Sequence, residues 1–319
     1  MSGTIVNFLY AAILSGTPLL FGTVGEILSE KAGNLNLGVE GMMWLGAFAG
    51  FYVAYKTDSP FLAILSAFGL AALGALIYAF LTVTMKANQN VTGLTLTTFG
   101  IGLSLVMGYA MTDNLGGAPK VSDGFRAAIA PVDIPVLSDI PYIGKLLFQL
   151  NPLIYLGIAI AVICTIYLTG TRSGLNVRAV GENASAADAA GINVTLVKYS
   201  NIVIGGGICG IGGAFMSLVT ANGSWQPSGI VNGNGWIAVA LVIFVSWSPA
   251  KAIFGSFIFG AFNSLTNYIP ASIIDIPKPF YQMLPFVLTT LVLIITSVRK
   301  SKNNAQPADC GINYFREER

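Results

Sequence analysis

The sequence has no histidine, few cysteines and no phosphate-binding loop. The absence of histidine from 319 residues excludes Ser-His and Cys-His catalytic pairs and the HExxH zinc helix. Cys164, Cys209 and Cys310 have no CxxC spacing, so they predict neither a disulfide framework nor a metal site. No GxxxxGKS or GxxxxGKT motif occurs. A process driven by nucleotide hydrolysis would therefore need the nucleotide to bind another subunit.

Charged residues are also scarce. They make up 9% of the chain, whereas a soluble domain carries about 25%. Hydrophobic residues make up 54%, and the mean hydropathy is +0.73. Apolar runs of about 20 residues are typical of membrane-crossing helices, whereas a membrane barrel would show alternating segments of about ten residues. The sequence therefore predicts an all-α, polytopic transmembrane helical bundle.

The apolar runs define the candidate spans. The first run either crosses the membrane or dips into it and returns, so we expect eight to ten spans. No basic residue precedes it, which favours an uncleaved membrane segment over a signal peptide. We expect residues 1–298 to form one transmembrane domain, followed by a cytoplasmic tail at 299–319. The candidate spans are 4–25, 37–55, 61–85, 92–112, 152–170, 198–221, 236–249, 252–269 and 281–298.

The placement of lysine and arginine predicts the orientation. If the polar segment 171–197 lies inside the cell, then Lys31, Lys86, Lys251 and the basic tail also lie inside. The outside then holds fewer basic residues, and with nine crossings the N-terminus is outside. The external loop 113–151 is large enough for a cap or a docking surface but too small for a domain. The basic residues outside are Lys56, Lys120, Arg126, Lys145 and Lys278.

The segment 170–196 is a polar interruption between apolar runs. Asn183 is a good N-cap, and Gly191 suits the left-handed residue that ends a helix, so we expect a two-turn helix between them. A helix this short is marginal in water. It must therefore pack on this chain or dock on another protein.

A weak internal repeat links two parts of the chain. Residues 36–76 and 232–262 each begin with asparagine and glycine, continue through an apolar run and turn at a Ser-Pro pair. On the predicted topology the two units enter the membrane from opposite sides. An inverted repeat of this kind places the substrate site of a transporter at the interface between the units, near the bilayer midplane.

Glu40 stands near the start of a run that is otherwise uncharged until Lys56. A carboxylate at membrane depth costs several kcal/mol unless it faces water, a partner or a polar substrate. Glu40 either lines a translocation path or lies at the inner interface close to Lys31. The adjoining sequence 33–38 favours a broken helix, which is tolerated at depth only where it lines a cavity or is buried in protein.

Polar and aromatic residues elsewhere could also contact a solute. Threonines after Asn88 can bind a hydroxyl- or amide-bearing solute, or they can bond back to the preceding turn. Tryptophans near Asn232 suit sugar rings or nucleobases, but they also mark membrane interfaces. Gly206 and Gly210 form a GxxxG motif for close helix packing, and their GxGxxG overlap lacks a βαβ context. The candidate path residues are Asn36, Glu40, Trp44, Asn90, Thr95, Thr98, Phe99, Trp225, Gln226 and Trp236.

Three stretches resemble the permease subunit of an ABC importer, the binding-protein-dependent family that serves simple sugars, nucleosides and branched-chain amino acids. They are GEILSEKAGNLNLGVEGMM at 25–43, the segment 178–192, and PFYQMLP at 279–285 with the terminal YFREER. The first is most similar to the branch that works with lipoproteins of the basic-membrane-protein type, associated with nucleoside uptake.

The resemblance implies a bacterial inner-membrane protein that is not itself an enzyme. It implies a second permease subunit, often a different chain, a cytoplasmic ATPase pair that binds ATP and magnesium, and an external binding lipoprotein. The short helix would be the segment that the ATPase grips, and the permease itself would bind no cofactor. The coupling residues would be Gly181, Glu182, Asn183, Ala186, Ala187 and Gly191.

Two functions of different kinds remain open from the sequence. The first is the membrane subunit of an ATP-driven importer for nucleosides, or for simple sugars by the same machinery. The second is an ion-coupled secondary carrier with Glu40 as its coupling carboxylate. The carrier needs no partners, but it leaves the polar segment 181–191 and the terminal REER sequence unexplained. Co-purification of an ATPase would separate the two.

Overall fold

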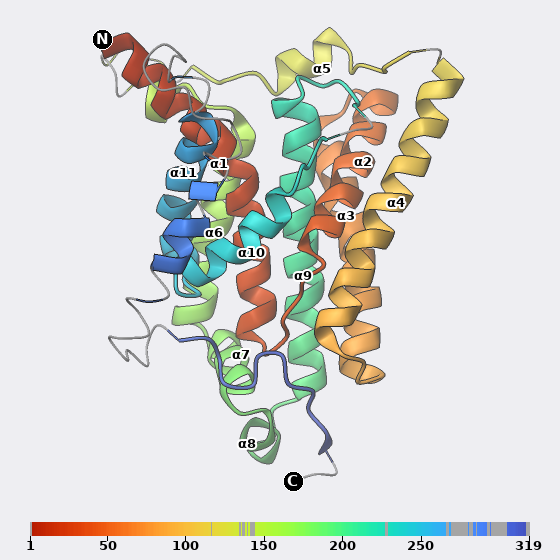
Figure 1. The fold of residues 1–319 in the computed structure, drawn as a ribbon, viewed down its shortest axis with the longest axis vertical. Helices are drawn as coiled ribbons and strands as arrows, with labels where there is room; N and C mark the ends of the chain where they lie inside the picture. Colours follow the sequence, from red (N-terminus) through yellow and green to blue (C-terminus); the bar gives the residue numbers. More distant parts are fainter. Residues whose placement is uncertain are drawn as a thin grey trace.

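The computed structural model is an all-helical bundle (Figure 1). It describes residues 2–115, 117–133, 144–226, 229–265 and 305–316 continuously, and scattered positions at 135–140 and 268–294. The helices before the polar segment are α1 (Ser2–Lys31), α2 (Val39–Thr57), α3 (Pro60–Ala79), α4 (Gln89–Leu115), α5 (Asp123–Ala128) and α6 (Pro152–Gly170). Those that follow are α7 (Arg172–Glu182), α8 (Ala184–Ala189), α9 (Val194–Phe215), α10 (Asn234–Phe244) and α11 (Pro249–Leu265), with π-helical turns η1 (Phe80–Thr84), η2 (Gly144–Phe148) and η3 (Met216–Thr220).

In the part of the chain that the structure describes, five helical stretches are long and apolar enough to cross a membrane. They are Thr4–Lys31, Pro60–Thr84, Gln89–Asp113, Pro152–Gly170 and Val194–Thr220. The predicted spans 61–85, 92–112, 152–170 and 198–221 correspond to four of them, and 37–55 corresponds to α2. The prediction of an all-α membrane bundle is confirmed, and the chain is a multi-pass membrane protein.

Two predicted spans differ from the structure. The run 4–25 belongs to the single 30-residue helix α1, so Glu26, Glu30 and Lys31 are helical and the first segment does not dip and return. The run 236–249 becomes α10, which has 11 residues and a length of about 16 Å, too short to cross. α10 ends before Ser246 and Trp247, both of which have positive φ. Half of 281–298 and most of 279–285 lie outside the described residues.

The two ends of the bundle carry different segments (Figure 1). The N-terminus and α5 lie at one end, and α7, α8 and the C-terminal segment 305–316 lie at the other. The lower ends of α1 and α3, close to Lys31 and Lys86, share the end that holds α8. The arrangement therefore places the polar segment, these lysines and the tail together, as their charge predicts.

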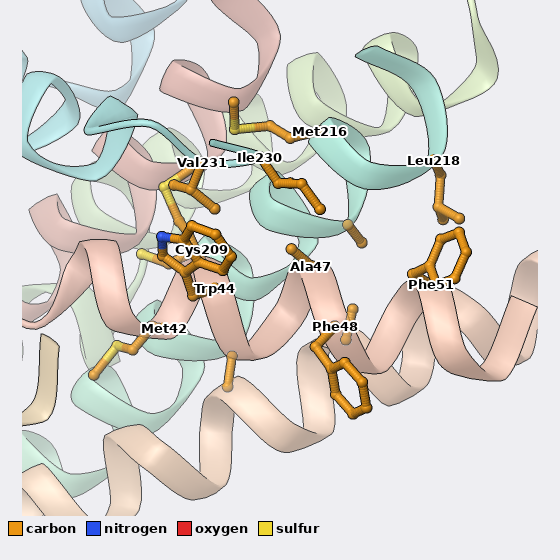
Figure 2. Packing of buried hydrophobic residues seen from close by; sticks show 14 of the residues in the cluster. Met42, Trp44, Ala47, Phe48, Phe51, Cys209, Met216, Leu218, Ile230 and Val231 are labelled. Atoms are coloured by element: carbon orange, nitrogen blue, oxygen red, sulfur yellow. The ribbon is translucent and has the colours of Figure 1, made fainter. Parts of the chain in front are cut away.

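Close approach of α9 to its neighbours organises the core. α9 contacts α1, α2 and α3, and Figure 2 shows side chains of α2 meeting those of α9 and η3. A Cβ atom at Gly213 would overlap the carbonyl oxygen of Met43, and one at Gly206 would overlap Ala75. Gly210 likewise leaves no room beside Ala67 and Ala71, so the predicted close packing of the GxxxG pair is confirmed. Small residues allow this contact, which dispersion stabilises inside a membrane.

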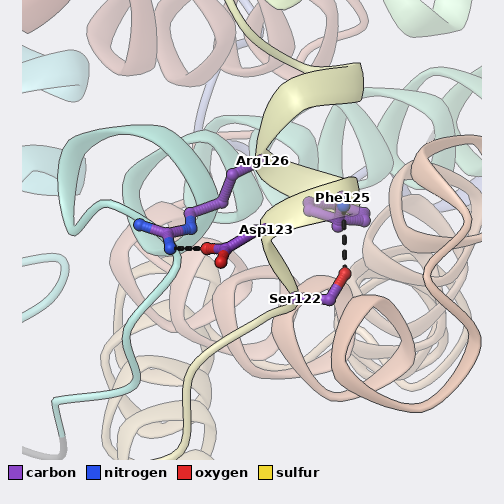
Figure 3. A network of polar contacts seen from close by, with 4 residues as sticks. All are labelled: Ser122, Asp123, Phe125 and Arg126. Atoms are coloured by element: carbon purple, nitrogen blue, oxygen red, sulfur yellow. Dashed lines mark hydrogen bonds and ion pairs between the residues drawn. The ribbon is translucent and has the colours of Figure 1, made fainter.

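The loop after α4 folds back on the chain at the α5 end. The Ser122 hydroxyl caps α5 by accepting a 3.0 Å hydrogen bond from the Phe125 amide, and Asp123 pairs with Arg126 (Figure 3). The Val121 amide donates to the Gly223 carbonyl at 2.9 Å, which ties the loop to the turn after η3. The loop therefore covers this end of the bundle, as a cap would.

Candidate functional site

Glu40 lies where the first turn of α2 meets the first turn of α10. Its Oε2 accepts a 2.7 Å hydrogen bond from the Gly235 amide, and its Oε1 accepts a 2.9 Å bond from the Gly233 amide. The Trp44 indole donates to Oε1 at 3.3 Å. The carboxylate is 4% exposed, and it satisfies free amides at the positive end of α10.

The sequence before α2 explains why the helix begins there. The Asn36 side chain accepts from the Gly38 amide at 2.9 Å, and the Asn36 amide donates to Glu26 Oε1 at 2.8 Å. Thr97 of α4 donates its hydroxyl to the Leu37 carbonyl at 2.9 Å. The non-helical segment at 34–36 is therefore hydrogen-bonded, with Asn34 and Asn36 buried and Leu35 half-buried, and the helix is broken there as the 33–38 sequence predicts.

The two repeat units meet at this junction. α2 and α10 run in opposite directions (Figure 1), and α3 and α11 follow them after Ser-Pro pairs. A Cβ atom at Gly235 would overlap the Glu40 backbone, so this contact requires glycine. No ion pair joins Glu40 to Lys31 in the described part of the chain. Both sequence interpretations of Glu40 omit its role as the cap of α10.

A cavity of about 320 Å³ opens beside the start of α10. Its lining combines amide side chains with aromatic rings, which suits a ligand that has both hydrogen-bonding groups and a flat face. Trp236, one of the predicted path residues, is half-buried there. The lining residues are Asn232, Gly233, Asn234, Trp236, Ile237, Asn263 and Phe286.

A second cavity, of about 440 Å³, lies between α2 and α4. The rings of Phe48 and Tyr52 stack with centroids 5.7 Å apart, and the Lys56 amine lies 5.8 Å from the Tyr55 ring centroid. Met107 and Met111 of α4 form the opposite wall. Stacked aromatic rings and thioethers bind flat aromatic ligands well.

The remaining predicted path residues fall into two groups. Asn90, Thr95, Thr98 and Phe99 share an exposed face of α4, where Thr95 and Thr98 bond back to the preceding turn at 2.8 and 3.2 Å. Gln226 is also exposed.

Trp225, by contrast, is fully buried against Phe48 and Phe51, so it supports the aromatic cavity from behind and does not face a solute. Trp44 is also buried and contacts Glu40.

The predicted short helix is α8, and its ends are as expected. Asn183 accepts a 2.8 Å hydrogen bond from the Ala186 amide. Gly191 has φ of +84°, and the amides of Gly191 and Ile192 donate to Asp188 and Ala187 at 2.9 and 3.0 Å. This pairing is the Schellman C-cap. The local signals for this helix are confirmed.

The coupling residues differ in exposure. Glu182, Asn183, Ala186 and Gly191 are exposed, whereas Ala187 is buried against Val180 and Val194. Gly181 is also buried, because a Cβ atom there would overlap the Lys31 carbonyl oxygen. Ala187 therefore packs on its own chain, whereas Ala186 is accessible to a partner.

A groove of about 850 Å³ lies beside α8, between this helix and the C-terminal segment. It runs along the turn from Gly191 to Leu196 and is closed by Tyr314 and Arg316 of the tail. Lys86 also lines it, and partial burial lowers the pKa of this lysine below its ordinary value. The described residues contain no group of three or more acidic, cysteine or histidine side chains that could bind a metal ion.

Residues 8–294 match the family described as the permease component of the branched-chain amino acid transport system. The chain belongs to this permease family. It is 34% identical to the nucleoside ABC transporter permease protein NupC of Lactococcus lactis subsp. cremoris, over 96% of each chain. It is 33% identical to the guanosine ABC transporter permease protein NupQ of Bacillus subtilis, over 89% of each chain. The glucose ABC transporter permease protein TsgB13 of Haloferax volcanii is 27% identical over 83% of this chain and 72% of its own. No solved structure matches.

Sequence reasoning missed several residues of the permease that the structure brings into these sites. Gly233 and Gly235 bind Glu40, and Tyr52 lines the aromatic cavity. Asp309 of the tail accepts a 2.7 Å hydrogen bond from the Ala184 amide of α8. The glycines next to Asn232 signal a constrained helix start, but no local pattern connects them to Glu40.

Proposed function

We propose that this chain is the membrane subunit of an ATP-driven nucleoside importer in a bacterial cell membrane. The observation that carries the proposal is the 34% identity over 96% of both chains to a permease named for nucleosides. A relative named for guanosine adds support at 33% identity. The permease forms the path, and nucleosides reach it from an external binding lipoprotein.

The two cavities fit the chemistry of a nucleoside. A purine or pyrimidine can stack on the Tyr52 ring in the cavity between α2 and α4. Ribose hydroxyls can bond to amides such as those of Asn232 and Asn234 beside α10. The exposed threonines of α4 offer further hydroxyls along the same helix as Met107. A second permease subunit, of a different chain, would complete the path opposite this face.

The energy source belongs to a separate subunit. The chain has no phosphate-binding loop, and α8 with the groove beside it forms a docking surface at one end of the bundle. A cytoplasmic ATPase that binds ATP and magnesium contacts the exposed Ala186 of α8 and the two exposed residues just before the helix, Glu182 and Asn183. Nucleotide-driven closure of the ATPases then tilts α7 and α9, the helices that flank α8 in the chain.

Simple sugars are the second candidate substrate, because a relative named for glucose also covers most of the chain. The aromatic cavity favours nucleosides, since a nucleobase presents two flat faces and a sugar presents hydroxyls around its ring.

An ion-coupled carrier is disfavoured, because the Glu40 carboxylate is occupied by the α10 amides.

Purification and calorimetry test the proposal. The tagged permease should bring down an ATPase and a second permease from the native membrane. The lipoprotein expressed with it should bind guanosine or adenosine in titration calorimetry and release no heat with glucose. An isolated permease that transports alone in liposomes, or a lipoprotein that binds only sugars, would overturn the proposal.

A further inference from the structure

The C-terminal segment 305–316 runs beneath the bundle and contacts α8 (Figure 1). Asp309 makes two hydrogen bonds at the start of α8. Its carboxylate accepts from the Ala184 amide at 2.7 Å, and its own amide donates to the Gly181 carbonyl at 2.9 Å. Both groups are ones that a helix end leaves without an internal partner. The tail therefore supplies the bonds that the junction of α7 and α8 lacks.

The same segment holds the other end of α8. The Tyr314 hydroxyl donates to Asp188 Oδ2 at 2.7 Å, and Arg316 Nε lies 3.4 Å from the same oxygen. α8 itself buries only small side chains, Ala184 and Ala187, against Val180 and Val194. A six-residue helix with so little buried area depends on these additional contacts for its position.

The tail also holds the segments that lead into α4 and α2. Asn313 donates to the carbonyls of Lys86 and Ala87 at 2.7 and 3.1 Å, and it accepts from Gln89 at 3.0 Å. Gln89 is 3% exposed, and its side-chain oxygen Oε1 accepts a 2.8 Å bond from the Leu35 amide. Tyr78 of α3 donates its hydroxyl to the Leu35 carbonyl at 2.6 Å. These bonds connect the tail, α4 and the segment before α2 in one continuous network.

We propose that the C-terminal segment is the mechanical link between α8 and the starts of α2 and α4, with Asp309 and Asn313 as its positioning residues. Asp309 binds the start of α8 and Asn313 binds the turn before α4, so a movement of α8 displaces that turn. The link reaches α2 within a few residues of Glu40, and α4 carries the exposed polar face. This inference rests on the proposed ATP-driven import.

The competing explanation is that movement of α8 passes directly to the helices next to it in the chain, α7 and α9. α7 continues from α6, and α9 begins five residues after α8 ends, so both move with it. That route leads into the centre of the bundle and does not include the turn at Lys86 and Ala87. The two routes differ in one respect: only the tail route makes transport depend on the side chain of Asn313.

The test measures uptake and ATP hydrolysis together in proteoliposomes that hold the complete transporter. Asn313→Ala should keep binding-protein-stimulated hydrolysis while the amount of guanosine moved per ATP falls about five-fold or more. Ile312→Ala changes an exposed side chain of the same segment and should keep the wild-type ratio. Asn313→Asp, which retains the acceptor for Gln89 and loses the donors, should give an intermediate ratio.

The outcomes separate this inference from the proposed function. If the wild-type transporter moves no nucleoside with ATP, the proposed function fails. If it does, and Asn313→Ala keeps the wild-type ratio, the mechanical link is wrong. If Asn313→Ala does not reach the membrane in normal amounts, Asn313→Asp, which conserves side-chain shape, decides by the same ratio. An unchanged ratio in Asn313→Asp would then overturn the inference.

Discussion

The Glu40 carboxylate accepts a 2.7 Å hydrogen bond from the backbone amide of Gly235, 195 residues along the chain. The bond joins the starts of two helices that run in opposite directions, α2 and α10 (Figure 1). It places a buried negative charge at the positive end of a short helix, where several amides have no partner within the helix. The stability of this junction therefore depends on one side chain.

Replacing Glu40 with alanine should weaken the junction. The amides of Gly233 and Gly235 would lose their acceptor inside the protein, which costs about 1–3 kcal/mol for a buried group. We expect a lower midpoint of thermal unfolding in detergent, followed by intrinsic fluorescence. Asp113→Asn, which alters an exposed carboxylate on α4, should melt like the wild type. Equal midpoints for Glu40→Ala and Asp113→Asn would show that the bonds contribute nothing.

Gly213→Ala should prevent normal assembly of the bundle. The added methyl group would overlap the Met43 carbonyl oxygen, and backbone cannot move aside as a flexible side chain can. We expect the yield of monodisperse protein in size-exclusion chromatography to fall severalfold. Gly102→Ala is the matched control, because a methyl group there meets nothing within 4 Å. A normal yield of Gly213→Ala would contradict the tight contact between α2 and α9.

Tryptophan at two neighbouring alanines of α8 should give different defects. Ala186 is exposed, so Ala186→Trp should leave a folded permease that fails to bring down the ATPase. Ala187 is buried against Val180, so Ala187→Trp should instead lower the yield of folded protein. Thermal unfolding and co-purification on the same preparations separate the two effects. Identical behaviour of both variants would refute the orientation of α8.

Tyr52→Ala should selectively weaken nucleoside transport. Stacking of one base on an aromatic ring is worth about 1–3 kcal/mol, so the KM for guanosine should rise about five-fold or more. Tyr109→Ala is the control, because Tyr109 is exposed on α4 and lies outside the cavity lining. If Tyr52→Ala transports guanosine with an unchanged KM, the cavity between α2 and α4 is not a base site.

Local signals predicted the parts of the fold that depend on neighbouring residues. Asn183 and Gly191 fix the ends of α8 through hydrogen bonds within a few residues, so their roles could be recognised in the sequence. The apolar runs that form α3, α4, α6 and α9 are long enough to indicate helices without knowledge of the helices that they pack against. Ser59 and Pro60 likewise mark the start of α3.

Features that depend on distant contacts could not be predicted. The sequence Val245-Ser246-Trp247 contains no glycine or proline, yet α10 ends there, and the Trp247 indole donates a hydrogen bond to Glu30 of α1. The polar sequence around Trp225 predicts an exposed aromatic residue in a loop, but Phe48 and Phe51 of α2 cover its ring. The sequence of the tail predicts a solvated basic end. Its hydrogen-bond partners, Gln89 and Ala184, lie more than a hundred residues away and so leave no local signal.

Uptake in sealed proteoliposomes tests the central claim most directly. The vesicles should hold this permease, its ATPase and its second permease, with the lipoprotein outside and ATP inside. We predict that labelled guanosine accumulates against its gradient only when ATP is present, and that unlabelled adenosine competes while glucose does not. Accumulation of glucose without guanosine, or accumulation driven by an ion gradient in the absence of ATP, would contradict the account.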